Sequence, residues 1–160
     1  GDNWGFGYGD KFWQFYKGEN YLVMDNPNVN AKTIRHITSA PNHVRVWKRE
    51  VYQQIRGHAR NLFVADDYEL MVRTFLVTKM AKIKKMLYIQ HYKDMNTAQR
   101  VRNKEIQRLV DSIAKYYDLA IHNRLLELGV DDFVWTENGA NMNISNPEIE
   151  QFVNVNVENV

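Results

Sequence analysis

The chain has 160 residues, of which 44% are hydrophobic, and its formal net charge at pH 7 is +2. This size suits one domain with extensions, and the share of apolar residues is ordinary for a globular protein. The absence of cysteine excludes disulfide bonds and thiolate metal sites. The sequence has no run of about 18 uncharged apolar residues, so no membrane span is predicted.

Charge is distributed unevenly along the chain. Residues 43–108 carry 15 Lys or Arg against 6 Asp or Glu, whereas residues 109–160 carry 2 against 9. A basic middle and an acidic end leave three interpretations open. The two parts face each other, both are simply solvated, or an acidic partner binds the basic middle.

Residues 1–40 are predicted to form an extended aromatic arm. Glycines alternate with aromatic residues through its first half, and glycine at this density opposes a long regular helix. Each aromatic side chain buries about 150–250 Å² when it packs, so we expect rings such as Trp4 and Trp13 to dock into a partner or onto the chain's own core. One or two helical turns are expected over residues 11–17, and no β-hairpin is predicted.

The first of three predicted helices runs from about residue 42 to residue 63. Val44, Trp47 and Val51 begin a series of apolar residues at helical spacing, which is typical of a helix with one buried face. Gly57 lies inside this stretch, where glycine costs up to about 1 kcal/mol relative to alanine. It therefore indicates the close approach of another backbone.

The second predicted helix begins at Asp66 and Asp67, because acidic side chains stabilise the positive end of the helix dipole. It continues to about residue 92 along one apolar stripe. The stripe consists of Leu76, Met80, Ile83 and Leu87. The third helix begins after Asn96 and ends at Gly129, a residue suited to the left-handed conformation just beyond a helix.

The predicted fold class is therefore all-α, an antiparallel three-helix bundle with an extended aromatic N-terminal arm and an acidic irregular C-terminal tail. The short connections between helices favour antiparallel neighbours. Residues 1–40 form the arm, residues 41–129 the three-helix domain and residues 130–160 the tail. The alternation of Val and Asn over residues 153–157 favours an extended end that adds to a sheet edge or frays.

The sequence contains no constellation of residues that predicts catalysis or metal binding. Its five histidines are scattered, without the paired spacing of zinc hydrolases. We expect His58 to pack near the apolar stripe of the first helix and His122 to lie on the surface. The side chains of the adjacent residues Asp131 and Asp132 diverge, so they are not placed to share a metal ion or a proton. We expect both of them in a solvated loop. No catalytic, cofactor or metal site is predicted, and the protein is predicted not to be an enzyme.

The basic residues over positions 79–108 also have more than one interpretation. They could contact phosphates, with Tyr88 and Tyr92 stacking on bases. An acidic protein partner is the preferred interpretation, because dedicated nucleic-acid binders are usually basic throughout and this chain ends in an acidic tail. A solvated face is the remaining interpretation.

Val51-Tyr52-Gln53 is followed by Arg56, by Arg60 and then by a second basic and aromatic group. That group consists of Phe63, Tyr68, Arg73, Phe75 and Lys79. Over about residues 47–118 this order resembles the LYR-motif family of small mitochondrial proteins. The family signature is Leu-Tyr-Arg near the start of the first of three helices, then basic residues and a downstream Phe. Gln in place of the signature Arg removes a positive charge.

The resemblance implies a three-helix protein that binds mitochondrial acyl carrier protein, with the acyl chain entering the helix bundle. It implies that Tyr52 lines the bundle entrance and that Phe75 packs inside. Basic side chains would meet the acidic helix or the phosphate of the carrier protein. These are Arg56, Arg60, Arg73 and Lys79.

We therefore predict a non-catalytic accessory or structural subunit of a large mitochondrial assembly, specifically a respiratory-chain complex. The expected location is mitochondrial, on the matrix side or associated with the inner membrane, with no transmembrane segment. A mitochondrial ribosome-associated or other RNA-contacting protein is the first alternative, and a structural component of a virion is the second. The predicted partner-binding residues are Trp4, Trp13, Tyr52, Arg56, Arg60, Arg73, Lys79 and Lys82.

Overall fold

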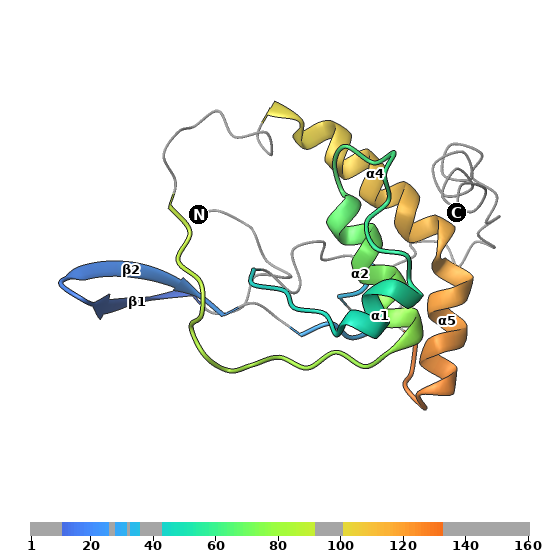
Figure 1. Cartoon of the computed structure of the whole chain (residues 1–160), viewed down its shortest axis with the longest axis horizontal. Helices are drawn as coiled ribbons and strands as arrows, with labels where there is room; N and C mark the ends of the chain where they lie inside the picture. The colour runs from blue at the N-terminus through green and yellow to red at the C-terminus, as the bar shows by residue number, and fades with distance from the viewer. Residues whose placement is uncertain (1–10, 26–27, 32, 36–42, 92–100, 133–160) are drawn as a thin grey trace.

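In the part of the chain that it describes, the computed structural model consists of a β-hairpin followed by four helices (Figure 1). The described residues are 11–25, 28–31, 33–35, 43–91 and 101–132. The strands are β1 (Lys11–Tyr16) and β2 (Glu19–Met24). The helices are α1 (Arg49–Gln54), α2 (Asp66–Val77), α4 (Asn103–Tyr116) and α5 (Asp118–Glu127). The prediction of an all-α three-helix bundle is therefore wrong. Within these residues, no helix combines the length and apolar character that a membrane crossing requires.

Residues 11–24 form the antiparallel hairpin, whose strands pair in register along their whole length. Lys17 and Gly18 connect the strands and have φ values of 48° and 85°, the positive values that a type I′ turn requires. The prediction of helical turns over residues 11–17 is wrong. The aromatic and aliphatic side chains of both strands favour a pleated pair, once glycine permits the tight turn.

Helix α1 is much shorter than the predicted helix of residues 42–63. It ends at Gln54 because Arg56 and Gly57 both adopt positive φ values, of 61° and 65°. The N–H groups of these two residues donate to carbonyls of the last turn, as in a Schellman motif. Gly57 therefore lies beyond a helix end. The group that approaches it is the Tyr52 ring, 2.9 Å from where a Cβ would stand, and not another backbone.

Residues 43–48, which were expected to be helical, have no regular secondary structure and contact α2. Arg45 and Trp47 are half-buried, whereas the two valines of this stretch are 54% and 86% exposed. The Trp47 indole N–H donates to Thr74 Oγ1 at 2.9 Å. The Arg45 guanidinium donates to Asp67 Oδ2 at 2.7 Å. Alternating burial is typical of an extended chain, so bonds to α2 replace those of a longer α1.

Helix α2 is the centre of the helical body, and most of its residues are buried. It begins at Asp66, as predicted, but ends at Val77 and not near residue 92. Farther along the predicted stripe, Ile83 and Leu87 are 64% and 57% exposed. Most helices in proteins depend on the packing of an apolar face for stability, and this part of the stripe has little covering it.

The third predicted helix is divided at Tyr117 into α4 and α5, and both of these helices contact α2 (Figure 1). Tyr117 is buried, with φ −89° and ψ 3°, away from ideal α-helical values. The division lets both halves pack on α2, where a straight helix of their combined length would project beyond it. The predicted start at Asn96 lies outside the described residues.

The predicted end of the last helix at Gly129 is confirmed. Gly129 has a φ value of 66°, and the N–H groups of Gly129 and Val130 donate to carbonyls of the last turn. This is a Schellman motif with glycine in its usual place.

The core lies where α2, α4 and α5 meet. Its most deeply buried apolar side chains are Val72, Ile113, Ile121 and Leu125. Residues of the N-terminal 40 also belong to it, since Ala31 and Ile34 are buried in the same cluster. The Tyr68 hydroxyl donates to the carbonyl of Ile34 at 2.7 Å, so the helical body extends beyond the predicted domain.

Arg35 ties this N-terminal segment to the first residue of α5 and to the chain beyond its end. The side chain of Arg35 is 3% exposed, with Nε 2.5 Å from Asp118 Oδ1 and Nη1 2.7 Å from Asp132 Oδ1. His122 Nδ1 lies 2.6 Å from Asp132 Oδ2. The expectation that Asp132 lies in a solvated loop is wrong, because its side chain is 13% exposed and bound by both groups.

We predict that Leu125→Ala lowers the free energy of unfolding by about 2–5 kcal/mol, because it removes a fully buried side chain and leaves a cavity. Leu126 is the matched control, since it is the next residue on α5 and is 60% exposed. Leu126→Ala should change the free energy by less than about 0.5 kcal/mol. Urea unfolding followed by circular dichroism measures both, and equal losses would contradict the buried face assigned to α5.

Asp132 should make the protein sensitive to acid. Burial opposes its charged form, but the hydrogen bonds from His122 and Arg35 outweigh burial and lower the pKa of Asp132. Such a group stabilises the fold fully above its unfolded pKa of about 3.9, and this stability is lost as pH falls through the folded pKa. Asp132→Asn should therefore flatten the decline in unfolding free energy below about pH 4.

Urea unfolding at a series of acidic pH values measures this effect. Asp131→Asn is the control, because it removes an adjacent carboxylate that is exposed. The unfolding free energy of this variant should decline with falling pH as that of the wild type does. The same decline in Asp132→Asn would show that the pairing with Arg35 contributes nothing.

Candidate partner-binding surface

One face of the hairpin carries three exposed apolar side chains. Trp13 and Phe15 are 70% and 68% exposed, and Leu22, opposite Trp13 on β2, is 49% exposed. Side chains two residues apart on a strand, and those directly opposite across a strand pair, lie on the same face. Among the described helices and strands, β1 and β2 contact only each other. The three side chains therefore form an open patch, which we call the hairpin patch.

A basic segment adjoins the base of the hairpin. Residues 79–91, the lysine segment, follow α2 without regular secondary structure, and the predicted residues Lys79 and Lys82 are exposed there. Lys82 pairs with Asp25, directly after β2. The structure thus brings Lys82 to the base of the element that carries Trp13, and the predicted Trp4 lies outside the described residues.

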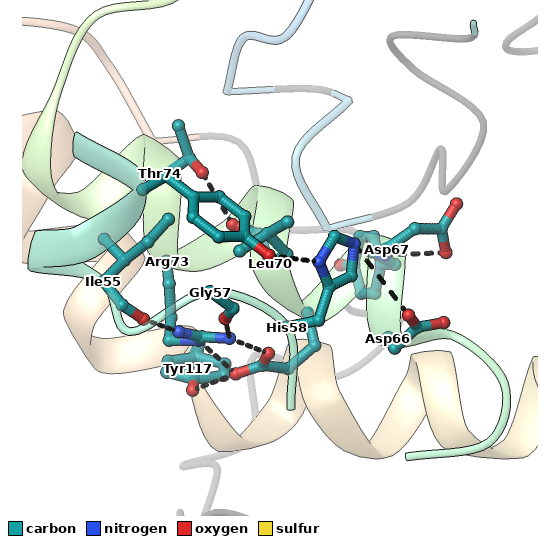
Figure 2. Close-up of polar contacts among 12 residues, drawn as sticks. Ile55, Gly57, His58, Asp66, Asp67, Leu70, Arg73, Thr74 and Tyr117 are labelled. Atoms are coloured by element: carbon teal, nitrogen blue, oxygen red, sulfur yellow. Dashed lines mark hydrogen bonds and ion pairs between the residues drawn. The ribbon is translucent and has the colours of Figure 1, made fainter. Parts of the chain in front are cut away.

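His58, after the end of α1, and Asp66, at the start of α2 (Figure 2), form a row of three polar side chains with Tyr52 of α1. Its hydroxyl lies 2.9 Å from His58 Nδ1, and His58 Nε2 lies 4.0 Å from Asp66 Oδ2. The His58 side chain is 45% exposed, so the expectation of a packed histidine near the apolar stripe of the first helix is wrong.

The order of a hydroxyl, an imidazole and a carboxylate is the one that nucleophilic catalysis uses. Proton transfer between Tyr52 and His58 fits their 2.9 Å separation. Asp66, however, is beyond hydrogen-bond distance from His58 and is 38% exposed, so water competes for both groups. We interpret the row as a set of structural contacts that hold the loop after α1 in place.

A buried network centred on Glu69 also holds this loop, through the contacts of Arg73 with Ile55 and Gly57 (Figure 2). The Glu69 side chain is 2% exposed, and Nε and Nη2 of Arg73 each lie 2.6 Å from one of its oxygens. The Tyr117 hydroxyl donates to Glu69 Oε1 at 2.8 Å. Arg73 also donates to the carbonyls of Ile55 and Gly57. Charge-assisted bonds of this kind are the strong ones, and here they join α2, the loop after α1 and the bend at Tyr117.

The electrostatics of the network fix its protonation. Burial and the charge of Glu69 raise the pKa of Tyr117 far above its ordinary value, so the hydroxyl remains a donor. Burial works against the charged form of Arg73, but the hydrogen bond and charge of Glu69 outweigh it and raise the pKa of Arg73. At neutral pH Tyr117 and Arg73 are therefore both protonated, as their hydrogen bonds to Glu69 require.

The predicted basic residues around Tyr52 have different surroundings. Arg56 and Arg60 are exposed on the loop between α1 and α2. Arg73 is bound internally by Glu69 and two backbone carbonyls, and its side chain is 20% exposed. The structure brings Tyr52 and Arg73 to the same loop, at residues 55–58, whereas Trp13 lies on a separate element.

Sequence reasoning misses Glu69 and Tyr117, which position this loop. The i, i+4 spacing of Glu69 and Arg73 is an available signal for a helical ion pair. Nothing local connects either residue to Tyr117, which lies 48 residues from Glu69 along the chain.

No similarity to a known protein adds to this geometry. Comparisons of the chain with protein-family models, curated proteins and solved structures find no match. The resemblance to the LYR-motif family, with the partners and location that it implies, therefore stays a prediction. Within the described ranges, no group of three or more His, Cys, Asp or Glu side chains could hold a metal ion.

We predict that Arg73→Lys lowers the free energy of unfolding by about 1–3 kcal/mol. Lysine keeps the charge but loses the planar fork that binds Glu69 and two carbonyls together. Amide hydrogen exchange over residues 55–58 should become faster, because the carbonyl anchors are lost. Urea unfolding and hydrogen exchange measure these two effects.

Arg102→Lys is the matched control, because Arg102 also binds a glutamate through Nε and Nη2, at 2.7 Å each. That pair with Glu105 is exposed at the start of α4, and exposed ion pairs contribute little. Its substitution should be close to neutral. Equal effects of the two substitutions would show that burial of the Glu69 network is unimportant.

Proposed function

We propose that the protein is a non-catalytic structural subunit that joins a larger protein assembly through the hairpin patch. The observation that carries this proposal is the exposure of Trp13, Phe15 and Leu22 on an element that contacts no other described helix or strand. Exposed apolar clusters usually mark interaction sites.

The energetics of the hairpin support docking. A two-stranded hairpin is marginally stable in water without packing against something else. Burying a large apolar side chain contributes about 1.5–3 kcal/mol, so a partner that covers the hairpin patch stabilises the hairpin and the complex together. Tryptophan is also enriched among the residues that dominate binding at protein interfaces.

The proposed partner is a protein with an apolar groove wide enough for two rings. The outer edges of β1 and β2 are not paired with any described strand, and unpaired edges can add to a partner's sheet. A groove beside a sheet edge would bind both the unpaired strand edge and the rings of the hairpin patch. Backbone hydrogen bonds along the edge would give affinity, and the rings would give specificity.

The identity of the assembly depends on other observations. A mitochondrial respiratory complex and acyl carrier protein are implied by the family resemblance alone, through Tyr52 and the basic residues after it. Copurification from the native source, followed by mass spectrometry of the partners, tests that prediction directly. Stoichiometric recovery of acyl carrier protein is the result expected from the resemblance.

We predict that the double substitution Trp13→Ala and Phe15→Ala removes the copurifying partner subunits, because burial of both rings is lost. The free energy of unfolding of the helical body should change by less than about 0.5 kcal/mol, since both side chains are exposed. Size-exclusion chromatography with mass spectrometry measures the first effect, and urea unfolding measures the second.

Phe63→Ala is the control for removal of an aromatic side chain, because Phe63 is 84% exposed on the loop before α2. It should leave the complex intact. Retention of all partners by the double variant would refute the proposal. Loss of the partners at moderate salt, with no effect of the hairpin substitutions, would favour phosphate contacts and an RNA-contacting protein.

A further inference from the structure

The lysine segment combines dense positive charge with a complete lack of negative charge. Four lysines fall between residues 79 and 85, and no acidic residue occurs between Glu69 and Asp94. Such a segment attracts anionic surfaces, because no neighbouring carboxylate within the sequence offsets its field.

The same segment exposes aliphatic side chains in unusual number. Ile83 is 64% exposed, Met86 and Leu87 are each 57% exposed, and Ile89 is 45% exposed. Every residue from 81 to 91 is exposed. Exposed aliphatic side chains next to lysines are typical of a segment whose partner has an apolar layer below a negatively charged layer.

The spacing of these residues fits a helix, although the segment is not helical in the structure. Ile83, Met86 and Leu87 stand at i, i+3 and i+4, so a helix would place them on one face, with Met80 one turn earlier. Lysine, methionine, leucine and alanine, which make up most of residues 79–87, are good helix formers. What the segment lacks is a surface against which the apolar face can pack, and short helices need one.

We infer that the lysine segment binds an anionic membrane surface and becomes an amphipathic helix when it does so. The aliphatic face enters the boundary between headgroups and acyl chains, and the lysine ammonium groups extend to the lipid phosphates. The helix lies in the plane of the membrane and does not cross it. This inference is independent of the hairpin patch.

A lipid surface fits these residues better than a nucleic acid or a protein groove. Nucleic-acid sites hold bases by aromatic stacking, but the exposed apolar residues here are mainly aliphatic, and Tyr88 already contacts the His43 ring at 5.5 Å. In a protein groove the strongly hydrated ammonium groups would lose water. At a bilayer they remain in the aqueous headgroup layer.

The contacts that hold the segment at present are easily exchanged. Lys82 pairs with Asp25, and the side chains are 29% and 58% exposed. Exposed ion pairs of this kind are weak, so a lipid phosphate can replace the carboxylate. The ring contact between His43 and Tyr88 is also on the surface, since both residues are exposed.

Vesicle binding by the full chain tests the inference. The protein should cosediment with phosphatidylcholine vesicles that contain about one-third phosphatidylserine, and not with phosphatidylcholine alone. Binding should weaken at high salt, because the headgroup attraction is screened. Circular dichroism should show a gain of helix on binding to the anionic vesicles.

Substitution of all four lysines by glutamine, at Lys79, Lys82, Lys84 and Lys85, should weaken vesicle binding roughly tenfold or more. The matched control replaces four exposed lysines outside the segment and changes the net charge equally. These are Lys17, Lys48, Lys104 and Lys115. The control should bind as the wild type does, and both variants should keep the thermal unfolding transition of the wild type.

Ile83→Ser with Leu87→Ser should also weaken binding and abolish the gain of helix, because the apolar face is lost. Leu119→Ser with Leu126→Ser is its control, since both leucines are exposed on α5. The Trp13→Ala and Phe15→Ala variant should bind vesicles normally, which separates this inference from the proposed function.

Three results would overturn the inference. The first is that the protein binds neutral and anionic vesicles equally. The second is that the two lysine variants lose vesicle binding to the same extent. The third is that the protein does not bind anionic vesicles and instead binds a single-stranded RNA oligonucleotide or an acidic protein through the same lysines.

Discussion

The buried carboxylate of Glu69 is the constraint on which the arrangement of the helical body depends. A charged side chain that is 2% exposed is stable only when it is paired and hydrogen-bonded. The partners that satisfy it are Arg73 on the same helix and Tyr117 at the bend between α4 and α5. Arg73 in turn binds the carbonyls of the loop after α1. One buried carboxylate network thus joins α2 to the loop after α1 and to the bend between α4 and α5.

This arrangement leaves the chemistry of binding to the outside of the molecule. The carboxylates of Glu69 and Asp132 hold segments of the chain together inside the fold. The hairpin patch and the lysine segment are instead built from exposed side chains. Both present apolar groups that water solvates poorly. The hairpin patch offers rings and the lysine segment offers aliphatic chains with charge, so the two surfaces suit partners of different chemistry.

Several local features could be predicted from the sequence because their physical causes lie within a few residues. The acidic pair at Asp66 marks the start of α2, and Gly129 marks the end of α5 through its positive φ. The hairpin could have been predicted from aromatic and aliphatic residues on both sides of Lys17-Gly18, but the turn needs a positive φ at Lys17 as well. Of the predicted site, Trp13 and the two lysines lie on exposed surfaces, while Arg73 is bound internally.

The sequence alone determined the helical periodicity, the uneven charge and the aromatic character of the first residues. Tertiary structure decided where α1 and α2 stop, since α1 ends where Arg73 binds its following loop and α2 ends before the exposed part of its predicted stripe. It also decided which charges are internal. Arg35 meets Asp118 and Asp132 across 83 and 97 residues, and attraction between groups so far apart in the chain becomes strong only when folding brings them within bonding distance and excludes water.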